Sequence, residues 1–427
     1  MALHALLTAA SLLGHAALLV WLYNRLHTKA WPPRWVKRLE RLTLAAGVLV
    51  AVILLVATLT ESSDFPKLAN LPPAQCRETA KWFAAVYRPV TYIAAVAVLP
   101  VWLIPKWRER PAQALLSNDT YQIDVVQELG FVPARGVVRR WVCRLPGNQM
   151  FQVAVQRKNL EIKRLPPALD GLTIAHLSDL HLTGQLELPY YELLVEHTLA
   201  LKPDMIVLTG DILEKEACLN WVEPIFGRLQ SPLGCYFVLG NHELRLPDVS
   251  RLRKALVSAG WIDLGGRSEI CRLRGHTLVF EGCEWPWHGA QPPWMRRSVC
   301  ALASPPPRDG DEPALRILLT HTPDVWLDAR CAGFDLVLAG HNHGGQICLP
   351  MIGPLIVPSR FGFRYAGGLY EQPPTLLHVS RGLGSTHSVR FRCPPELAVL
   401  VLRATSTRKK PLQSDGREDP NDREQNG

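Results

Sequence analysis

The sequence predicts an α/β domain that follows an N-terminal membrane region. Five β-rich runs between residues 172 and 346 each end in a turn that carries Asp, Asn or His, with helical patterns between them. Because α/β sheets place their sites at the carboxyl ends of strands, this repeated arrangement indicates one site built from several strands. Ahead of the domain, residues 1–110 contain three long apolar runs with basic flanks, which are typical of membrane-spanning helices.

Composition narrows the class of protein. The chain has 427 residues, enough for one large domain or two ordinary ones, and the 48% hydrophobic content is concentrated at the front. A net charge of +9 suits nucleic acid or an anionic membrane. The basic residues lie beside apolar runs and no nucleic-acid motif occurs, so we favour the membrane bilayer as partner. Ten scattered cysteines without CxxC pairs indicate reduced thiols.

Three membrane spans are predicted, at about residues 2–23, 42–59 and 82–104. A cleaved signal peptide is the competing interpretation of the first run. It is rejected because no basic segment precedes the run and no small-residue cleavage site follows it. The third run is interrupted by Arg88 and Pro89, and Arg88 can snorkel to the headgroups.

The basic segments predict the orientation. One lies between the first two spans, at residues 25–41, and the other follows the third span, at residues 106–110. The positive-inside rule places both in the cytoplasm, which makes this a multi-pass membrane protein with a cytoplasmic catalytic domain. If the third run does not cross, the domain moves to the outer face.

The rest of the chain divides into a lead-in segment (111–167), the α/β domain (168–404) and a polar, disordered tail (405–427). Strands are predicted at 151–155, 375–380 and 397–402, in addition to the five runs that end in polar turns. Helical patterns occur at 189–201, 218–229 and 249–259. The Pro- and Trp-rich stretch 285–313 is predicted to be mostly loop.

Candidate ligands follow the five runs in chain order. Run 172–177 is followed by Asp179 and His181, run 205–209 by Asp211, run 235–239 by Asn241 and His242, run 316–320 by His321, and run 336–339 by His341 and His343. Any one of these residues alone is more often a turn or core residue. Five such ends in succession favour a metal site.

The chemistry of this set indicates two metal ions. Carboxylate, amide and imidazole donors suit Mn, Fe or Zn and suit Ca poorly, and Mn is favoured here. Seven donors exceed the positions of one ion but fit two, provided that one carboxylate bridges. Two ions about 3.5–4 Å apart can share a hydroxide and hold a phosphate group. His242 is then free to donate a proton to the leaving oxygen or to stabilise phosphate charge.

This motif series resembles the calcineurin-like metallophosphoesterase superfamily and, within it, the membrane-associated YkuE/YaeI-like branch. Further matching stretches are 165–167, 321–324, 340–346, 381–384 and 394–396. The three-span front is similar to transmembrane proteins with metallophosphoesterase domains. Departures are small: Glu243 stands where Asp is frequent, and Asn342 where Thr is frequent.

The resemblance implies a fold and a set of roles. The fold is a β-sandwich flanked by helices on both outer faces (α/β/β/α). Asp179, His181 and His343 are expected to hold the first metal. Asn241, His321 and His341 are expected to hold the second, with Asp211 bridging. His242 is the expected catalytic histidine.

We therefore expect a membrane-anchored dinuclear phosphohydrolase that cleaves a phosphodiester or pyrophosphate bond by attack of a metal-bridging hydroxide. The anchor, together with related activity on lipid A precursors, makes a lipid-linked substrate plausible. Phosphomonoesters, soluble or on proteins, are the alternative, and nothing in the residues separates the two. A non-catalytic membrane scaffold is a third hypothesis, disfavoured by the intact ligand set. Trp285, Trp287 and Trp294 form either a substrate- or lipid-facing rim or ordinary loop packing.

Overall fold

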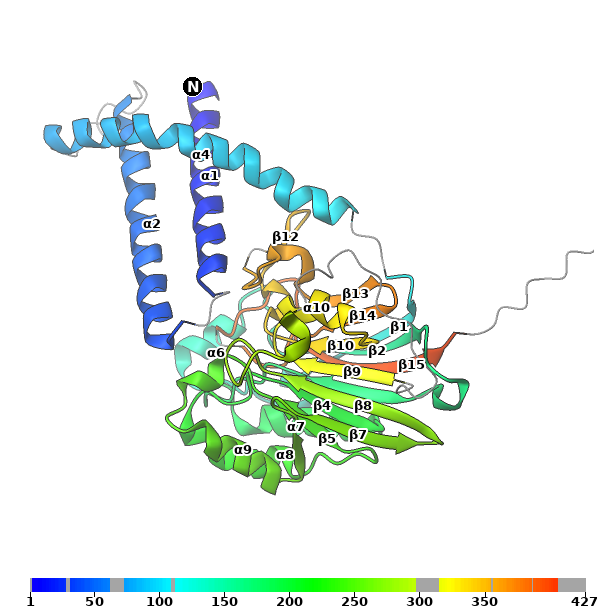
Figure 1. Ribbon diagram of the computed structural model, residues 1–427. Helices are drawn as coiled ribbons and strands as arrows, with labels where there is room; N and C mark the ends of the chain where they lie inside the picture. The colour runs from blue at the N-terminus through cyan, green and yellow to red at the C-terminus, as the bar shows by residue number, and fades with distance from the viewer. Residues whose placement is uncertain are drawn as a thin grey trace, which may run out of the picture.

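Two stacked β-sheets form the centre of the enzyme domain in the computed structural model (Figure 1), which describes residues 2–27, 31–61, 73–108, 112–296, 315–354, 356–385 and 387–405. The first sheet has the order β1 (Leu115–Asp124), β2 (Gln152–Ile162), β15 (Glu396–Ala404), β3 (Thr173–Leu177), β4 (Met205–Thr209), β5 (Cys235–Val238) and β6 (Trp261–Asp263). The second has the order β13 (Gly368–Gln372), β14 (Thr375–Val379), β10 (Leu336–Ala339), β9 (Leu315–Thr320), β8 (His276–Cys283) and β7 (Ser268–Leu273).

The central strands of the first sheet are buried on both faces. In β4, Met205 and Val207 enter the core between the sheets, whereas Ile206 and Leu208 enter the core beneath the outer helices. The central parallel strands β3, β4 and β5 therefore appear in the sequence as largely apolar runs without polar alternation.

Helices cover the outer faces of both sheets. The first sheet packs against α7 (Leu188–Ala200), α8 (Val222–Phe226) and α9 (Val249–Ser258), and the second against α10 (Trp326–Cys331). This arrangement confirms the predicted α/β/β/α sandwich. The helix expected at 218–229 is instead a 3-10 segment (Glu216–Trp221) followed by α8, because Pro224 has no N–H for a continuous helix.

Residues 111–167, predicted as a lead-in, contribute two strands to the first sheet. β2 pairs in parallel with β15, and β1 pairs with the other edge of β2. Between these strands lie two short helices, α5 (Val125–Leu129) and α6 (Val137–Cys143). The predicted tail lies outside the described residues apart from Thr405, and so do residues 297–313 of the predicted loop.

A buried polar network joins the two sheets inside the sandwich. Lys158 of β2 forms an ion pair with Glu396 of β15, and its Nζ lies 2.9 Å from Nε2 of His378 on β14. His378 in turn contacts His176 of β3 through their Nδ1 atoms, 2.8 Å apart. All four side chains are buried, so each depends on its neighbours for hydrogen bonds that water would otherwise supply.

The N-terminal region consists of three helices: α1 (Ala2–His27), α2 (Pro33–Glu61) and α4 (Ala74–Arg108). Among the described helices, α1 and α2 are long and apolar enough to cross a bilayer, over Leu6–His27 and Arg34–Leu59. Helix α4 covers the third predicted run and crosses α1 and α2 at a steep angle (Figure 1). Its passage through a membrane stays a prediction.

Polar side chains connect these helices. Ser11 of α1 contacts Thr91 of α4, with 2.9 Å between their hydroxyl oxygens. His15 lies 3.0 Å from the hydroxyl of Tyr87 and 2.9 Å from the carbonyl of Gly47 on α2. Polar pairs of this kind bind helices together where the surroundings are apolar.

Candidate metal centre

Five strand ends converge on one point between the two sheets. Strands β3, β4 and β5 belong to the first sheet, and β9 and β10 to the second, so the site joins both. The structure brings together all eight residues predicted from the sequence: Asp179, His181, Asp211, Asn241, His242, His321, His341 and His343.

The backbone at these strand ends is left-handed at five of the eight residues. The φ angles of Asp179, His181, Asp211, His341 and His343 lie between 49° and 72°. Such a conformation is sterically unfavourable for residues with a Cβ, and it turns each side chain back towards the site. Gly210 allows the turns to close together, since a Cβ there would lie 2.7 Å from Nδ1 of His321.

The first group of donors consists of Asp179, His181, Asp211 and His343. Nε2 of His343 lies 3.3 Å from Oδ1 of Asp179 and 2.8 Å from Nε2 of His181. Nε2 of His181 lies 3.8 Å from Oδ2 of Asp211. All four residues are buried, and their candidate donor atoms lie within 4.8 Å of one another.

The second group consists of Asp211, His321 and His341, with Asn241 beside them. Nε2 of His321 lies 3.2 Å from Oδ2 of Asp211, 3.1 Å from Oδ1 of Asn241 and 3.2 Å from Nδ1 of His341. Asp211 belongs to both groups, the position required of a carboxylate that bridges two ions.

Hydrogen bonds on the far side of three rings fix which nitrogen faces the centre. Nδ1 of His321 donates to the carbonyl of Thr209 at 2.7 Å, and Nε2 of His341 donates to the carbonyl of Pro358 at 3.0 Å. Nδ1 of His181 donates to Oε1 of Glu214 at 2.6 Å. In each neutral ring the nitrogen with a free lone pair therefore points inward, as metal ligation requires.

The electrostatics of this cluster also suit cations. Burial opposes charge on Asp211, but His242 and His321 hold the pKa of its carboxyl well below the usual range. Burial likewise opposes protonation of His321, yet Asp211 and Asp179 raise its pKa to about 9. Two buried carboxylates thus need positive charge beside them, which bound divalent metal ions would supply. The cluster fits such ions in donor type, orientation and charge.

Two glutamates to which the sequence interpretation gave no role organise the centre. Oε1 of Glu214 accepts hydrogen bonds from Nδ1 of both His181 and His242, each at 2.6 Å, and Glu214 also pairs with Arg245. Glu243 accepts from the backbone N–H groups of four residues in two strand-end turns: Asp211, Ile212, Leu213 and Gly240. The buried carboxylate of Glu243 thus holds the turns after β4 and β5 together. No sequence motif identifies Glu214, because the residues that it contacts lie far away in the sequence.

The tryptophans of the Pro-rich stretch lie in two different surroundings. Trp287 lies against the second group of donors, with ring centroids 4.9 Å from His341 and 5.5 Å from His321. Trp285 and Trp294 pack on the core of the second sheet instead. Only Trp287 borders the centre.

The end of α1 reaches the metal centre. Oδ1 of Asn24 accepts a hydrogen bond from the backbone N–H of Val357 at 3.0 Å, and both residues are buried. The next carbonyl, that of Pro358, is the one that orients His341. A single loop therefore connects the first apolar helix to a candidate ligand.

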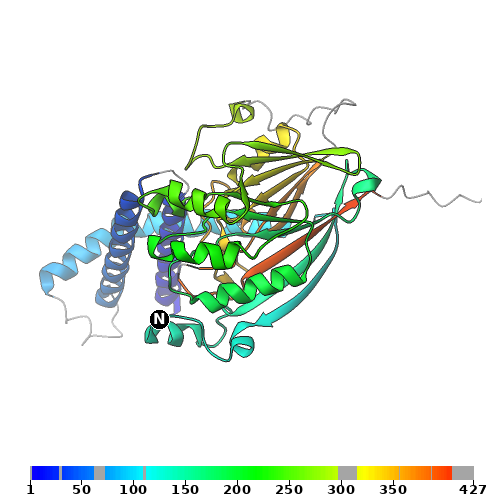
Figure 2. The ribbon, with the colours of Figure 1, turned by 90° about the horizontal axis from the view of Figure 1, so that it is seen from below.

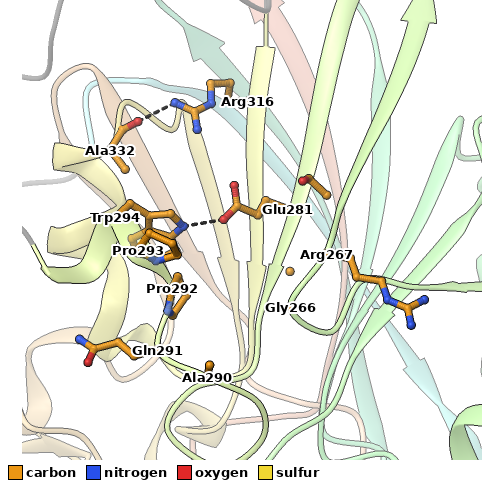
Figure 3. Close-up of a pocket in the computed structure, with 12 residues that line it drawn as sticks. Gly266, Arg267, Glu281, Ala290, Gln291, Pro292, Pro293, Trp294, Arg316 and Ala332 are labelled. Atoms are coloured by element: carbon orange, nitrogen blue, oxygen red, sulfur yellow. Dashed lines mark hydrogen bonds between the residues drawn. The ribbon is translucent and has the colours of Figure 1, made fainter.

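A second hollow lies apart from this centre. It has a volume of about 610 Å³ and is bordered by Gly266 and Glu281 and by the loop that carries Trp294 (Figure 3). Trp294 donates from Nε1 to Glu281, and Arg316 donates to the carbonyl of Ala332 at 2.6 Å. None of the eight predicted site residues lines it, so it does not belong to the strand-end centre.

The sandwich and its strand-end cluster define the class of a metal-dependent hydrolase. The model of the calcineurin-like phosphoesterase family matches residues 172–345. The metallophosphoesterase YkuE of Bacillus subtilis is 30% identical over 248 residues, which cover 57% of this chain and 82% of YkuE. This chain belongs to the calcineurin-like metallophosphoesterase family and is a phosphate-ester hydrolase.

Three further relatives carry informative names. The phosphodiesterase YaeI of Escherichia coli is 28% identical, covering 54% of this chain and 81% of YaeI. The UDP-2,3-diacylglucosamine pyrophosphatase LpxG of Chlamydia muridarum is also 28% identical, covering 54% and 84%. A transmembrane protein with metallophosphoesterase domain of Bos taurus is 29% identical, covering 66% of this chain and 65% of that protein.

Glu214→Gln should weaken metal binding while leaving the fold intact. A neutral amide accepts these two hydrogen bonds more weakly than a charged carboxylate does, and weakening such a partner typically lowers metal affinity about 10–100-fold. Competition with a chelator measures the affinity in the full-length protein. Glu216→Gln is the matched control, because Glu216 is exposed and pairs with Arg251. Equal affinities in both variants would contradict an orienting role for Glu214.

Proposed function

We propose that this protein is a membrane-anchored phosphohydrolase that works with two divalent metal ions. Asp179, His181 and His343 would hold one ion, Asn241, His321 and His341 the other, and Asp211 would bridge them. The observation that carries the proposal is the shared position of Asp211 between two groups of buried donors. Mn is the favoured metal, and Fe or Zn also suits this mixture of oxygen and nitrogen.

The ions would supply an activated water nucleophile and charge stabilisation. Seven donors with only two carboxylates leave the loaded centre positively charged, which favours an anionic phosphate group as substrate. The chain's own contribution to proton transfer is His242. Its Nδ1 is held by Glu214 and its Nε2 lies 3.7 Å from Oδ2 of Asp211. Burial lowers its pKa, although Asp211 and Glu214 oppose this effect. When protonated, His242 can donate to the leaving oxygen.

The substrate that we favour is a phosphodiester or pyrophosphate on a membrane lipid. YaeI and LpxG, both relatives over more than four fifths of their length, bear the names of a phosphodiesterase and a UDP-2,3-diacylglucosamine pyrophosphatase. The contact between Asn24 and the loop behind His341 keeps the centre close to the end of α1. A substrate embedded in the bilayer would therefore need to travel only a short distance.

A substrate panel tests this choice. Full-length protein in detergent with Mn is offered bis-p-nitrophenyl phosphate, p-nitrophenyl phosphate and a UDP-linked lipid. We expect the diester and the lipid pyrophosphate to be cleaved faster than the monoester. Faster cleavage of the monoester would favour the phosphomonoesterase alternative, and no cleavage by metal-loaded protein would favour a scaffold.

The same contact supports a cytoplasmic orientation of the enzyme domain. The enzyme domain meets α1 at its C-terminal end, which is also the end that continues into the basic segment 25–41. The positive-inside rule assigns that segment to the cytoplasm, and the domain beside it would lie there too. Helix α4 must then return the chain to the cytoplasmic side.

Asp211→Asn should abolish hydrolysis and remove at least one metal ion. The substitution exchanges a charged oxygen for an amide and leaves less negative charge between two cations. Metal analysis of the purified full-length protein, alongside an activity assay, measures both effects. Retention of two ions with unchanged activity would refute the bridging assignment.

His242→Ala should keep both metals while turnover falls by about 10²–10⁴-fold. The loss should shrink for substrates with good leaving groups, because these need less protonation. A series of aryl phosphodiesters with graded leaving-group pKa values measures this trend. An equal loss across the series would indicate phosphate stabilisation instead, and full activity would exclude both roles.

Cys76 should lie outside the cell. It is exposed in the first turn of α4, between the second and third predicted spans. In sealed cells, a membrane-impermeant maleimide should label a variant that keeps only Cys76. A matched variant that keeps only Cys271, on β7 of the domain, should react after permeabilisation alone. Labelling of Cys271 in sealed cells would place the domain on the outer face.

A further inference from the structure

Helix α6 presents an apolar face that no described part of the chain covers. The exposed fractions are 71% for Val137, 78% for Val138, 68% for Trp141 and 53% for Leu145. The spacing of these residues places them along one side of the helix and its continuation. Large aliphatic and aromatic groups grouped in this way usually mark a contact surface for a protein or a membrane.

This face is held outward by the packing of the opposite side. Cys143 is buried, and its Sγ contacts the carbonyl of Ser388. The side-chain amide of Asn148 donates to the carbonyls of Val142 and Ser388, at 2.9 and 3.0 Å. Because Trp141 lies about 200° around the helix axis from Cys143, it must point away from the domain.

Four arginines lie in α6 or next to its ends: Arg135, Arg139, Arg140 and Arg144. Two of them donate one side-chain hydrogen bond each to the local backbone. Arg139 donates to the carbonyl of Arg135, and Arg140 donates to the carbonyl of Ala134. Among the residues that the structure describes, no carboxylate forms an ion pair with any of the four. Their charge is therefore available to an anionic partner.

The position of α6 favours a membrane as that partner. In two perpendicular views, α6 lies on the side of the domain from which α1 and α2 extend (Figures 1 and 2). Trp31 and Trp35, both exposed, lie at the start of α2 beside the basic residues of segment 25–41. Aromatic and basic side chains are typical of the boundary between a bilayer and water.

We propose that α6 is a second membrane contact, which docks the enzyme domain on an anionic lipid surface. Val137, Val138, Trp141 and Leu145 would enter the headgroup region while the arginines bind lipid phosphates and carboxylates. This contact is independent of the proposed activity and goes beyond anchoring by α1 and α2, because it fixes how the domain faces the lipid.

Residues on both sides of α6 are linked by hydrogen bonds to loops of the candidate metal centre. The backbone N–H of Arg135 donates to the carbonyl of Gln185, in the loop that follows His181, at 2.9 Å. On the other side, Oδ1 of Asn148 accepts from the backbone N–H of Arg390 at 3.0 Å, and the Arg390 guanidinium lies 3.2 Å from His343. Docking of α6 would therefore hold the side of the domain that carries the candidate site near the lipid surface.

Amide hydrogen exchange on the full-length protein tests the proposal without any activity measurement. The protein is compared in detergent, in nanodiscs of phosphatidylcholine, and in nanodiscs that also contain phosphatidylserine. Exchange in a peptide covering α6 should be about tenfold slower in the phosphatidylserine discs than in detergent. Added salt should reverse part of this protection, because it screens the arginines.

Two variants separate the apolar and ionic contributions. Val138→Ser with Trp141→Ser should abolish protection in both kinds of disc. Arg139→Gln with Arg144→Gln should abolish only the difference between them. Ile270→Ser, at an exposed position on β7 of the opposite sheet, is the matched control and should behave as wild type. Unchanged exchange of β2 verifies that each variant is folded.

Equal exchange of α6 in detergent and in both discs would overturn the proposal, and its apolar face would then be assigned to a protein partner. Protection that is identical with and without phosphatidylserine would overturn the anionic requirement.

Discussion

The strained turns at the strand ends are the constraint on which the rest of the structure depends. Each left-handed non-glycine residue costs of the order of 1–3 kcal/mol, and five of the candidate metal-binding residues adopt that conformation. Backbone hydrogen bonds offset part of this cost: Asp179 donates to the carbonyl of Gly210 and His181 to that of Asp211. Glu243 ties the β4 and β5 turns together from within. The strained turns thus lower the stability of the fold, and they orient the donor side chains inward before any ligand binds.

The second requirement is that the two sheets keep a fixed relation, since the donors come from both. Apolar packing alone tolerates small slips between sheets, whereas the Lys158–Glu396 pair and its contact with His378 specify one arrangement. Glu396 also accepts from the backbone N–H of Arg381, at the start of the loop in which Leu383 and Gly384 donate to the carbonyls of Ser178 and Asp179. The buried network therefore supports the turn that carries Asp179 and His181 indirectly.

The sequence was sufficient for the parts that rest on local patterns. Continuous apolar runs with polar turns identified the five strand ends, and the eight residues at those ends lie together in the structure. The β1–β2 pair was harder to predict, because β1 is largely exposed and polar. The role of Glu214 depends on contacts with residues about thirty positions away, and no spacing rule reveals them. Helix α6 was missed because its outward apolar face contradicts the usual pattern of burial.

The hydrogen bonds that link Asn24 to the loop of Val357 and Pro358, and that loop to His341, make α1 part of the support of the candidate site. In many anchored enzymes the membrane segment can be deleted to give an equivalent soluble fragment. Here, deletion would also leave the buried N–H of Val357 without its partner and free the loop that orients one imidazole. Low activity in such a fragment would reflect altered geometry at the centre as well as separation from the bilayer. Comparisons between full-length and truncated forms therefore need a variant that breaks only this hydrogen bond.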